Sequence, residues 1–258
     1  MEHIKKWGEY LHEARKSSQE VDYIKKQYEQ LTIEQAYQIQ DQGIQLRVLD
    51  GEKVIALKMG LTSEAKRKQM NLFSAIYGVL TDKMQVENHY SLAGSIHPKI
   101  EPEIAFYVSE NLDQKSTEQQ IRSACTYVAP ALEILDSRFK SFKYFSLEDV
   151  IADNASSSHF CLGPKKSWDG KTDLKNLKMK MLVNGEVVQE GNSTAISEDP
   201  INSVFDQIKL LTSHGKTLKA GTWVLAGAAT PAYQLKGECE VSLEIESMES
   251  MSLKIGGK

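Results

Sequence analysis

One strand-like segment decides how the rest of the chain is interpreted, and it is His97-Pro98-Lys99-Ile100-Glu101-Pro102-Glu103-Ile104-Ala105-Phe106-Tyr107-Val108. Its second half, residues 104–108, is an apolar run of ordinary strand length. Residues two apart in a strand point to the same side, so Glu101 and Glu103 can direct two carboxylates into one space. Pro102 between them has no N–H to donate, which favours a sheet edge or a bulge. The segment therefore predicts a strand that carries a pair of carboxylates.

Such a pair also has an ordinary explanation. Alternating glutamates usually mark the solvated face of a half-exposed strand. The chain contains two further pairs for comparison, Glu238 with Glu240 and Glu244 with Glu246, which lie among apolar residues and need no special role. Spacing alone therefore favours a solvated face over a metal site.

A third carboxylate, Glu133, stands in the otherwise apolar segment 128–135. A carboxylate in such a setting is costly unless it is paired with a cation or bound to a metal. Arg138 is the candidate cation for the first alternative. For the second, three carboxylates without a nearby His or Cys pair suit a hard cation that prefers oxygen ligands, Mg²⁺ or Mn²⁺.

Lys58 presents the same problem with the opposite sign. It lies in the apolar run of residues 54–60, which we interpret as a buried strand. Its ammonium either reaches the surface or is buried beside an anion. Taken alone, the residues slightly favour a structural lysine, and they favour a turn for Asp82 and a polar loop for Ser156.

The remaining pattern indicates an α+β fold. The first fifty residues look helical, and Thr32 with Gln35 forms a capping box. A short polar helix is predicted from Ser63 to about residue 70. After Asp82 the chain is rich in strands, with candidates at residues 104–108, 131–135, 223–226, 240–245 and 252–255.

Two further elements have clear end signals. Residues 179–189 predict a hairpin that turns at Asn184-Gly185. Pro200 opens a helix that His214-Gly215 closes. We divide the chain into a helical N-terminal part with the Lys58 strand, residues 1–75, and a β-rich metal-binding catalytic domain, residues 76–258.

Composition and charge narrow the class of protein. The 258 residues carry a formal net charge of −4, and no basic stripe is present to neutralise phosphates, which argues against nucleic-acid binding. The three cysteines are far apart, unlike zinc ligands, and an odd count without a secretory signal fits a reducing compartment. No stretch approaches the roughly 18 to 20 apolar residues that cross a bilayer. We therefore expect a cytoplasmic protein with no membrane partner.

Several motifs together resemble one known enzyme group. They occur in order at residues 57–63 (LKMGLTS), 76–82 (IYGVLTD), 97–106 (HPKIEPEIAF), 133–138 (EILDSR) and 150–157 (VIADNASS). This set is similar to the decarboxylase and hydratase group of the fumarylacetoacetate hydrolase-like superfamily, from about residue 30 to the end of the chain. The resemblance implies a mixed β-roll or barrel with a helical N-terminal part, which agrees with the α+β pattern.

The resemblance also implies roles for the charged residues. Glu101, Glu103 and Glu133 would bind Mg²⁺, with Mn²⁺ as an alternative metal. Lys58 and Asp82 would be catalytic, with Asp82 orienting Lys58 or a water molecule.

A substrate pocket is implied as well. Ser156 would line it. We add Leu72 as a substrate-binding residue because the segment with Leu72, Phe73 and Ile76 lies between two of the motifs, and we expect it to form an apolar wall at the far end of the substrate.

The implied reaction is the metal-dependent decarboxylation of 4-oxalocrotonate (2-oxo-hex-3-enedioate), a small 2-oxo-enedioate of meta-cleavage aromatic catabolism. The motif variants around Met59, Tyr77 and Ser157 favour this reaction over the alternative, hydration of 2-hydroxypenta-2,4-dienoate on the same metal. A non-catalytic subunit that stabilises a partner enzyme is less favoured, because Lys58 and the three glutamates are intact. The resemblance further implies a homo-oligomer and a complex with the pathway hydratase.

Overall fold

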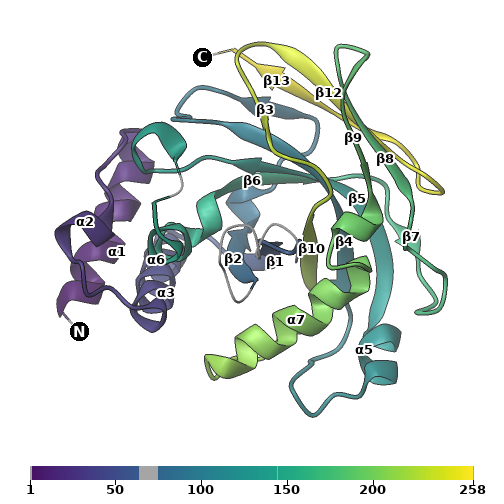
Figure 1. Cartoon of the computed structure of the whole chain (residues 1–258), viewed down its shortest axis with the longest axis horizontal. Coiled ribbons are helices and arrows are strands. Elements are labelled where there is room, and N and C mark those ends of the chain that lie inside the picture. Colours follow the sequence, from purple (N-terminus) through teal and green to yellow (C-terminus); the bar gives the residue numbers. More distant parts are fainter. Residues whose placement is uncertain (1, 64–74, 144, 258) are drawn as a thin grey trace.

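The computed structural model describes residues 2–63, 75–143 and 145–257. The N-terminal part is helical, as predicted, and α1 (Glu2–Ser17), α2 (Ile24–Gln27) and α3 (Ile33–Leu49) lie together on one flank (Figure 1). The predicted capping box begins α3, because Thr32 and Gln35 exchange side-chain to backbone hydrogen bonds. The helix predicted from Ser63 to about residue 70 falls almost entirely outside the described residues.

The larger sheet carries the candidate site. Its strands run in the order β2 (Ile76–Thr81), β1 (Val54–Gly60), β10 (Thr222–Ala228), β4 (Lys99–Val108), β5 (Cys125–Leu135) and β6 (Ser157–Leu162), with β11 (Tyr233–Gln234) on β4 and β7 (Lys166–Ser167) on β5. β1 and β10 are parallel and the other neighbours are antiparallel, so the sheet is mixed. The strand predicted at residues 131–135 is the end of the longer β5.

The register between β4 and β5 sets the geometry of the glutamates. Glu101 lies directly opposite Glu133, and Glu103 lies opposite Ala131. Directly opposed residues share a face of the sheet, and so do residues two apart on one strand. The three carboxylates therefore leave the sheet on the same side.

The smaller sheet has the strand order β3 (His89–Ser91), β13 (Met251–Gly256), β12 (Cys239–Ile245), β8 (Lys178–Val183) and β9 (Glu186–Asn192). The predicted hairpin joins β8 to β9, and its turn residues Asn184 and Gly185 have φ of 51° and 83°, as a type I′ turn requires. Glu240 and Glu244 of β12 are exposed, which confirms the solvated face expected for those comparison pairs.

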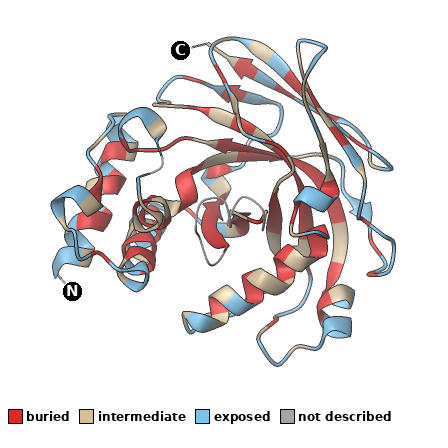
Figure 2. Ribbon diagram, in the orientation of Figure 1, coloured by how far each residue is buried: buried red, intermediate tan, exposed pale blue. Residues whose placement is uncertain are grey.

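The two sheets curve into a half-barrel, with α5 (Glu118–Ala124) and α7 (Pro200–Ser213) beside the larger sheet and α6 (Leu147–Ala152) between it and α3 (Figure 1). Buried residues follow the curved sheets and the inner sides of the helices (Figure 2). The apolar stripe of α7 is buried at Val204, Ile208 and Leu211. None of the described helices combines the length and apolarity that a bilayer crossing requires.

Candidate active site

Three carboxylates meet on one side of the larger sheet. Glu101 and Glu103 come from β4 and Glu133 from β5, and one carboxylate oxygen of each lies within 4.8 Å of the others. Glu103 and Glu133 are fully buried, while Glu101 is half-buried at the edge of a cavity. The structure therefore brings together the three residues that the sequence singled out.

Hydrogen bonds satisfy only some of the oxygens of the two buried carboxylates, Glu103 and Glu133. Burial raises the pKa of Glu103 well above its usual value, and the neighbouring Glu133 and Glu101 raise it further. One oxygen of Glu103 accepts from the Gly227 N–H at 2.8 Å. Within the described part of the chain, Glu103 Oε1 and Glu133 Oε2 have no hydrogen-bond partner. Buried carboxylate oxygens without partners are costly, and carboxylate oxygens are hard ligands. Such a group of oxygens therefore fits a divalent cation.

Lys58 of β1 supplies a positive charge beside the cluster. Its Nζ lies 3.2 Å from Glu133 Oε1, and the two side chains are 4% and 0% exposed. Burial lowers the pKa of Lys58, but the three glutamates outweigh burial and raise this pKa overall, which favours the ammonium form. Arg138, the alternative partner for Glu133, instead forms a buried ion pair with Asp153. Lys58 is therefore neither a surface lysine nor a lysine paired with a lone carboxylate.

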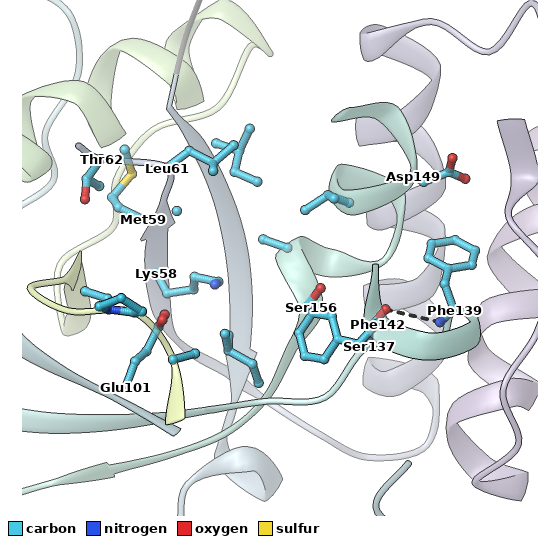
Figure 3. Close-up of a pocket in the computed structure, with 18 of the residues that line it drawn as sticks. Lys58, Met59, Leu61, Thr62, Glu101, Ser137, Phe139, Phe142, Asp149 and Ser156 are labelled. Carbon is cyan, nitrogen blue, oxygen red and sulfur yellow. Dashed lines mark hydrogen bonds between the residues drawn. The ribbon is translucent and has the colours of Figure 1, made fainter. Parts of the chain in front are cut away.

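A cavity of about 320 Å³ opens beside Lys58 and Glu101. Away from these charges its wall is largely aromatic, from Tyr23, Phe139, Phe142 and Phe145. Figure 3 shows Lys58 and Glu101 at one end and Phe139 and Phe142 toward the other. The cavity thus has one end with Lys58 and Glu101 and a second end that is largely aromatic, where the exposed Lys143 and the buried Asp149 also belong to the wall.

Ser156 enters this cavity from a turn of left-handed backbone. Asn154, Ala155 and Ser156 have φ of 54°, 52° and 58°. A left-handed conformation costs an L-residue about 1–2 kcal/mol, less for Asn, so such a turn persists only where its surroundings hold it. The Asn154 side chain accepts from the Val79 N–H and donates to the Val79 carbonyl, both at 2.8 Å. Figure 3 shows Ser156 across the cavity from Lys58.

A family model described as fumarylacetoacetate (FAA) hydrolase C-terminal matches residues 63–255, well over half of the chain. The chain belongs to the fumarylacetoacetate hydrolase family. Among curated members it is 41% identical over 231 residues to a 4-oxalocrotonate decarboxylase from Pseudomonas sp., an alignment that spans 88% of this chain and 89% of the relative. It is 31% identical to a 2-hydroxyhexa-2,4-dienoate hydratase from Comamonas testosteroni, over 97% of each chain.

A solved structure of the family agrees with the fold. The 4-oxalocrotonate decarboxylase from Pseudomonas putida G7, complexed with magnesium and adipate, matches with a TM-score of 0.93 at 31% identity, covering 98% of this chain and 97% of that chain. The fold class and the family resemblance predicted from the motifs are thereby confirmed. The two curated relatives are thus a decarboxylase and a hydratase, and the solved structure is that of a decarboxylase.

The structure does not bring Asp82 to the site. Its carboxylate accepts from the N–H groups of Lys53 and Lys83, each at 2.9 Å, and caps the turn that follows β2. Lys58 pairs with Gly78 on β2, so Asp82 lies four residues farther along, a strand distance of roughly 13 Å. The prediction that Asp82 belongs to the catalytic set is therefore corrected. Asp82 is a turn residue, as the residues taken alone favoured.

The predicted substrate residues have separate outcomes. Ser156 and Ile76 line the cavity. Leu72 and Phe73 lie outside the described residues. Sequence reasoning missed the aromatic wall, although the density of aromatic residues at 139–145 was a signal that could have indicated it.

Gly78 is where β2 meets the left-handed turn. A Cβ added there would lie 2.6 Å from Ser157 Oγ and 2.8 Å from the Asn154 carbonyl oxygen. We therefore expect Gly78→Ala to lower the free energy of unfolding by about 1–3 kcal/mol through overpacking. Gly43 in α3 is the matched control, because nothing lies within 4 Å of its added Cβ. Urea titration of both variants measures the effect, and Gly43→Ala is expected to stabilise the protein slightly. A Gly78→Ala variant that is no less stable than the wild type would contradict the close approach at Gly78.

Proposed function

We propose that this member of the family is a Mg²⁺-dependent decarboxylase that converts 4-oxalocrotonate into 2-hydroxypenta-2,4-dienoate and CO₂. The observation that carries the proposal is the site, in which three clustered carboxylates and a buried lysine stand at one end of a cavity whose other end is aromatic. The 41% identity to a 4-oxalocrotonate decarboxylase supports it. The complex of a similar decarboxylase with magnesium and adipate also supports it, because adipate is a dicarboxylate of the same carbon length.

Glu101, Glu103 and Glu133 are the residues that would hold the cation. Their donors are all carboxylate oxygens, which suit Mg²⁺ better than softer metals. A bound Mg²⁺ would act as a Lewis acid that polarises the 2-oxo group of the substrate.

The reaction breaks the bond between C5 and the C6 carboxylate. The electron pair left on C5 moves through C4 and C3 to the oxygen on C2, CO₂ departs, and the enolic oxygen takes one proton. Negative charge therefore grows at the C2 oxygen in the transition state, where a fixed positive charge has its largest effect. Lys58 is buried at the end of the cavity where the three glutamates lie, and its pKa is raised, which favours the ammonium form. We therefore assign Lys58 the role of stabilising the C2 oxygen or of supplying its proton.

The aromatic end suits the carboxylate that leaves. That group loses its charge as CO₂ forms, so a tight ion pair would stabilise the substrate more than the transition state. Phe139, Phe142 and Phe145 offer uncharged contact, and Lys143 at this end is exposed, so it would pair with the carboxylate only weakly. The substrate would thus lie with its 2-oxo acid at Lys58 and its C6 carboxylate among the phenylalanines.

The deciding experiment supplies two substrates separately to the purified protein in excess Mg²⁺. With 4-oxalocrotonate we expect release of one CO₂ per enedioate consumed. With 2-hydroxypenta-2,4-dienoate we expect little loss of dienol absorbance. Rapid hydration of the dienoate without CO₂ release from the enedioate would reverse the choice, and the 31% identity to a hydratase makes this the outcome to test against.

Lys143 lines the aromatic end with an exposed side chain. An exposed cation attracts a dianionic substrate weakly, and it stabilises the ground state somewhat more than the transition state because the C6 carboxylate loses its charge. We therefore expect Lys143→Gln to raise KM about 2- to 5-fold with kcat unchanged or slightly raised. Lys140→Gln, which removes an exposed lysine that pairs with Asp22, is the control. A fall in kcat for Lys143→Gln alone would mean that the lysine takes part in the chemistry.

We also propose that the protein forms a homo-oligomer that associates with the hydratase consuming its product. The unstable dienol would then pass over a short distance. Light scattering on the purified protein, alone and mixed with such a hydratase, tests this, and a monomer that does not change mass on mixing would contradict it.

A further inference from the structure

The left-handed turn at residues 154–156 is held from the edge of the larger sheet. β2 is the end strand of that sheet's order, and its outer side meets the Asn154 side chain. Asn154 Oδ1 accepts from the Val79 N–H and Asn154 Nδ2 donates to the Val79 carbonyl. One amide side chain thus takes the place of a neighbouring strand at this point of the edge.

The backbone on both sides of the turn is fixed as well. The Ser156 carbonyl accepts from the Asp136 N–H at 2.8 Å, and the Ser157 carbonyl accepts from Arg138 Nη1 at 3.0 Å. The Asp153 carboxylate pairs with Arg138 in a buried contact. Inside the turn, the Ser156 N–H donates to the Asp153 carbonyl at 3.0 Å and the Ser157 N–H donates to the Asn154 carbonyl. The two side-chain hydrogen bonds from Asn154 to Val79, the Asn154 clamp, are what tie this turn to β2.

We propose that Asn154 is a positioning residue, which through its two hydrogen bonds to Val79 holds the turn that presents the Ser156 hydroxyl to the substrate. The inference rests on the proposed function to the extent that the cavity takes a dicarboxylate. Asn154 itself is not among the residues that line the cavity, whereas Ser156 is. Its effect on the substrate therefore has to pass through Ser156.

The chemistry of the clamp explains why asparagine fits this position. Asparagine tolerates left-handed backbone better than most residues and offers a donor and an acceptor side by side. Aspartate has the same shape but no donor, so its second oxygen would face the Val79 carbonyl oxygen. Asn154→Asp therefore breaks half of the clamp with little change in volume.

The test is a double-mutant cycle of Asn154→Asp and Ser156→Ala, read by kcat/KM for 4-oxalocrotonate and by calorimetric binding of adipate in Mg²⁺. We expect Asn154→Asp to lower kcat/KM about 10-fold, through a higher KM, and to weaken adipate binding by a similar factor. In the Ser156→Ala background the same change should have less than a 2-fold effect on either quantity. Such coupling is what residues acting as one unit show.

Asn184→Asp is the matched control. Asn184 also has left-handed backbone, with φ of 51°, but it lies in the turn between β8 and β9 and should leave kinetics and adipate binding unchanged. Asn154→Gly is the second variant, to be used if Asn154→Asp does not fold. Glycine accepts the left-handed backbone but lacks both hydrogen bonds.

The outcomes separate this proposal from the proposed function. Equal effects of the Asn154 substitution with and without the Ser156 hydroxyl would overturn the positioning role while CO₂ release stood. If no CO₂ is released but the Asn154 and Ser156 substitutions are still coupled in adipate binding, the decarboxylase proposal fails and the positioning role stands. A wild-type protein that does not bind adipate would overturn the positioning role, because the cavity would then not be a dicarboxylate site.

Discussion

Glu103→Gln should reduce metal-dependent turnover by about 10³-fold or more while the protein stays folded. Glu103 is fully buried, and its Oε1 has no hydrogen-bond partner among the described residues, so this oxygen, like Oε2 of Glu133, is available to a cation. Glutamine keeps the shape and can still accept from the Gly227 N–H, but it removes the negative charge. A loss of that size corresponds to about 4 kcal/mol of transition-state stabilisation, a reasonable share for a metal-assisted step.

The measurement pairs kinetics with calorimetric titration of Mg²⁺. Binding of Mg²⁺ should weaken in Glu103→Gln in parallel with the loss of turnover. After chelation of metal the variant should be at least as stable as the wild type, because it removes one of three crowded carboxylates. Glu240→Gln on the exposed face of β12 is the control and should change neither quantity. Full turnover in Glu103→Gln would remove this residue from the proposed metal site.

Much of the candidate site could be predicted because its geometry is local. The spacing of Glu101 and Glu103 guarantees a common side once the segment is a strand, whatever the strand pairs with. The apolar sequence around Glu133 and around Lys58 indicated that each buried charge needs a partner. In the structure the two charges are partners, because Lys58 Nζ lies 3.2 Å from Glu133 Oε1. Motif resemblance supplied the rest of the metal set and the fold.

What the sequence did not reveal depends on long-range register. That Glu101 faces Glu133 follows from the pairing of β4 with β5, which no local pattern encodes. The same holds for the clamp between Asn154 and Val79, whose partners are 75 residues apart. Asp82 illustrates the reverse error, since its place in a matched motif suggested proximity to Lys58, while the strand between them carries it away from the cavity.

Lys58→Met should lower kcat about 10²- to 10³-fold, the usual effect of removing one group that stabilises developing charge in a closed site. Methionine fills nearly the same volume, so the buried packing of β1 is kept. The variant loses the cation next to Glu133, and breaking a buried ion pair costs about 3–5 kcal/mol of stability when no other cation is present. Kinetics and thermal unfolding are therefore to be compared at saturating Mg²⁺, where a bound cation offsets much of that loss. Lys180→Met, at an exposed pair with Glu190, is the control.

The affinity for Mg²⁺ then separates a catalytic lysine from one that merely builds the metal site. The Lys58 ammonium is close to Glu133 and competes with a divalent cation for the same negative charge. Removing it should leave Mg²⁺ binding unchanged or make it tighter, in the direction opposite to Glu103→Gln, while kcat falls in both variants. A lysine whose task was to orient the carboxylates would instead show weaker metal binding in step with the lost turnover. Tighter or equal binding with a large loss of kcat is the result expected of a positive charge that acts on the substrate, and full turnover in Lys58→Met would exclude this residue from the reaction.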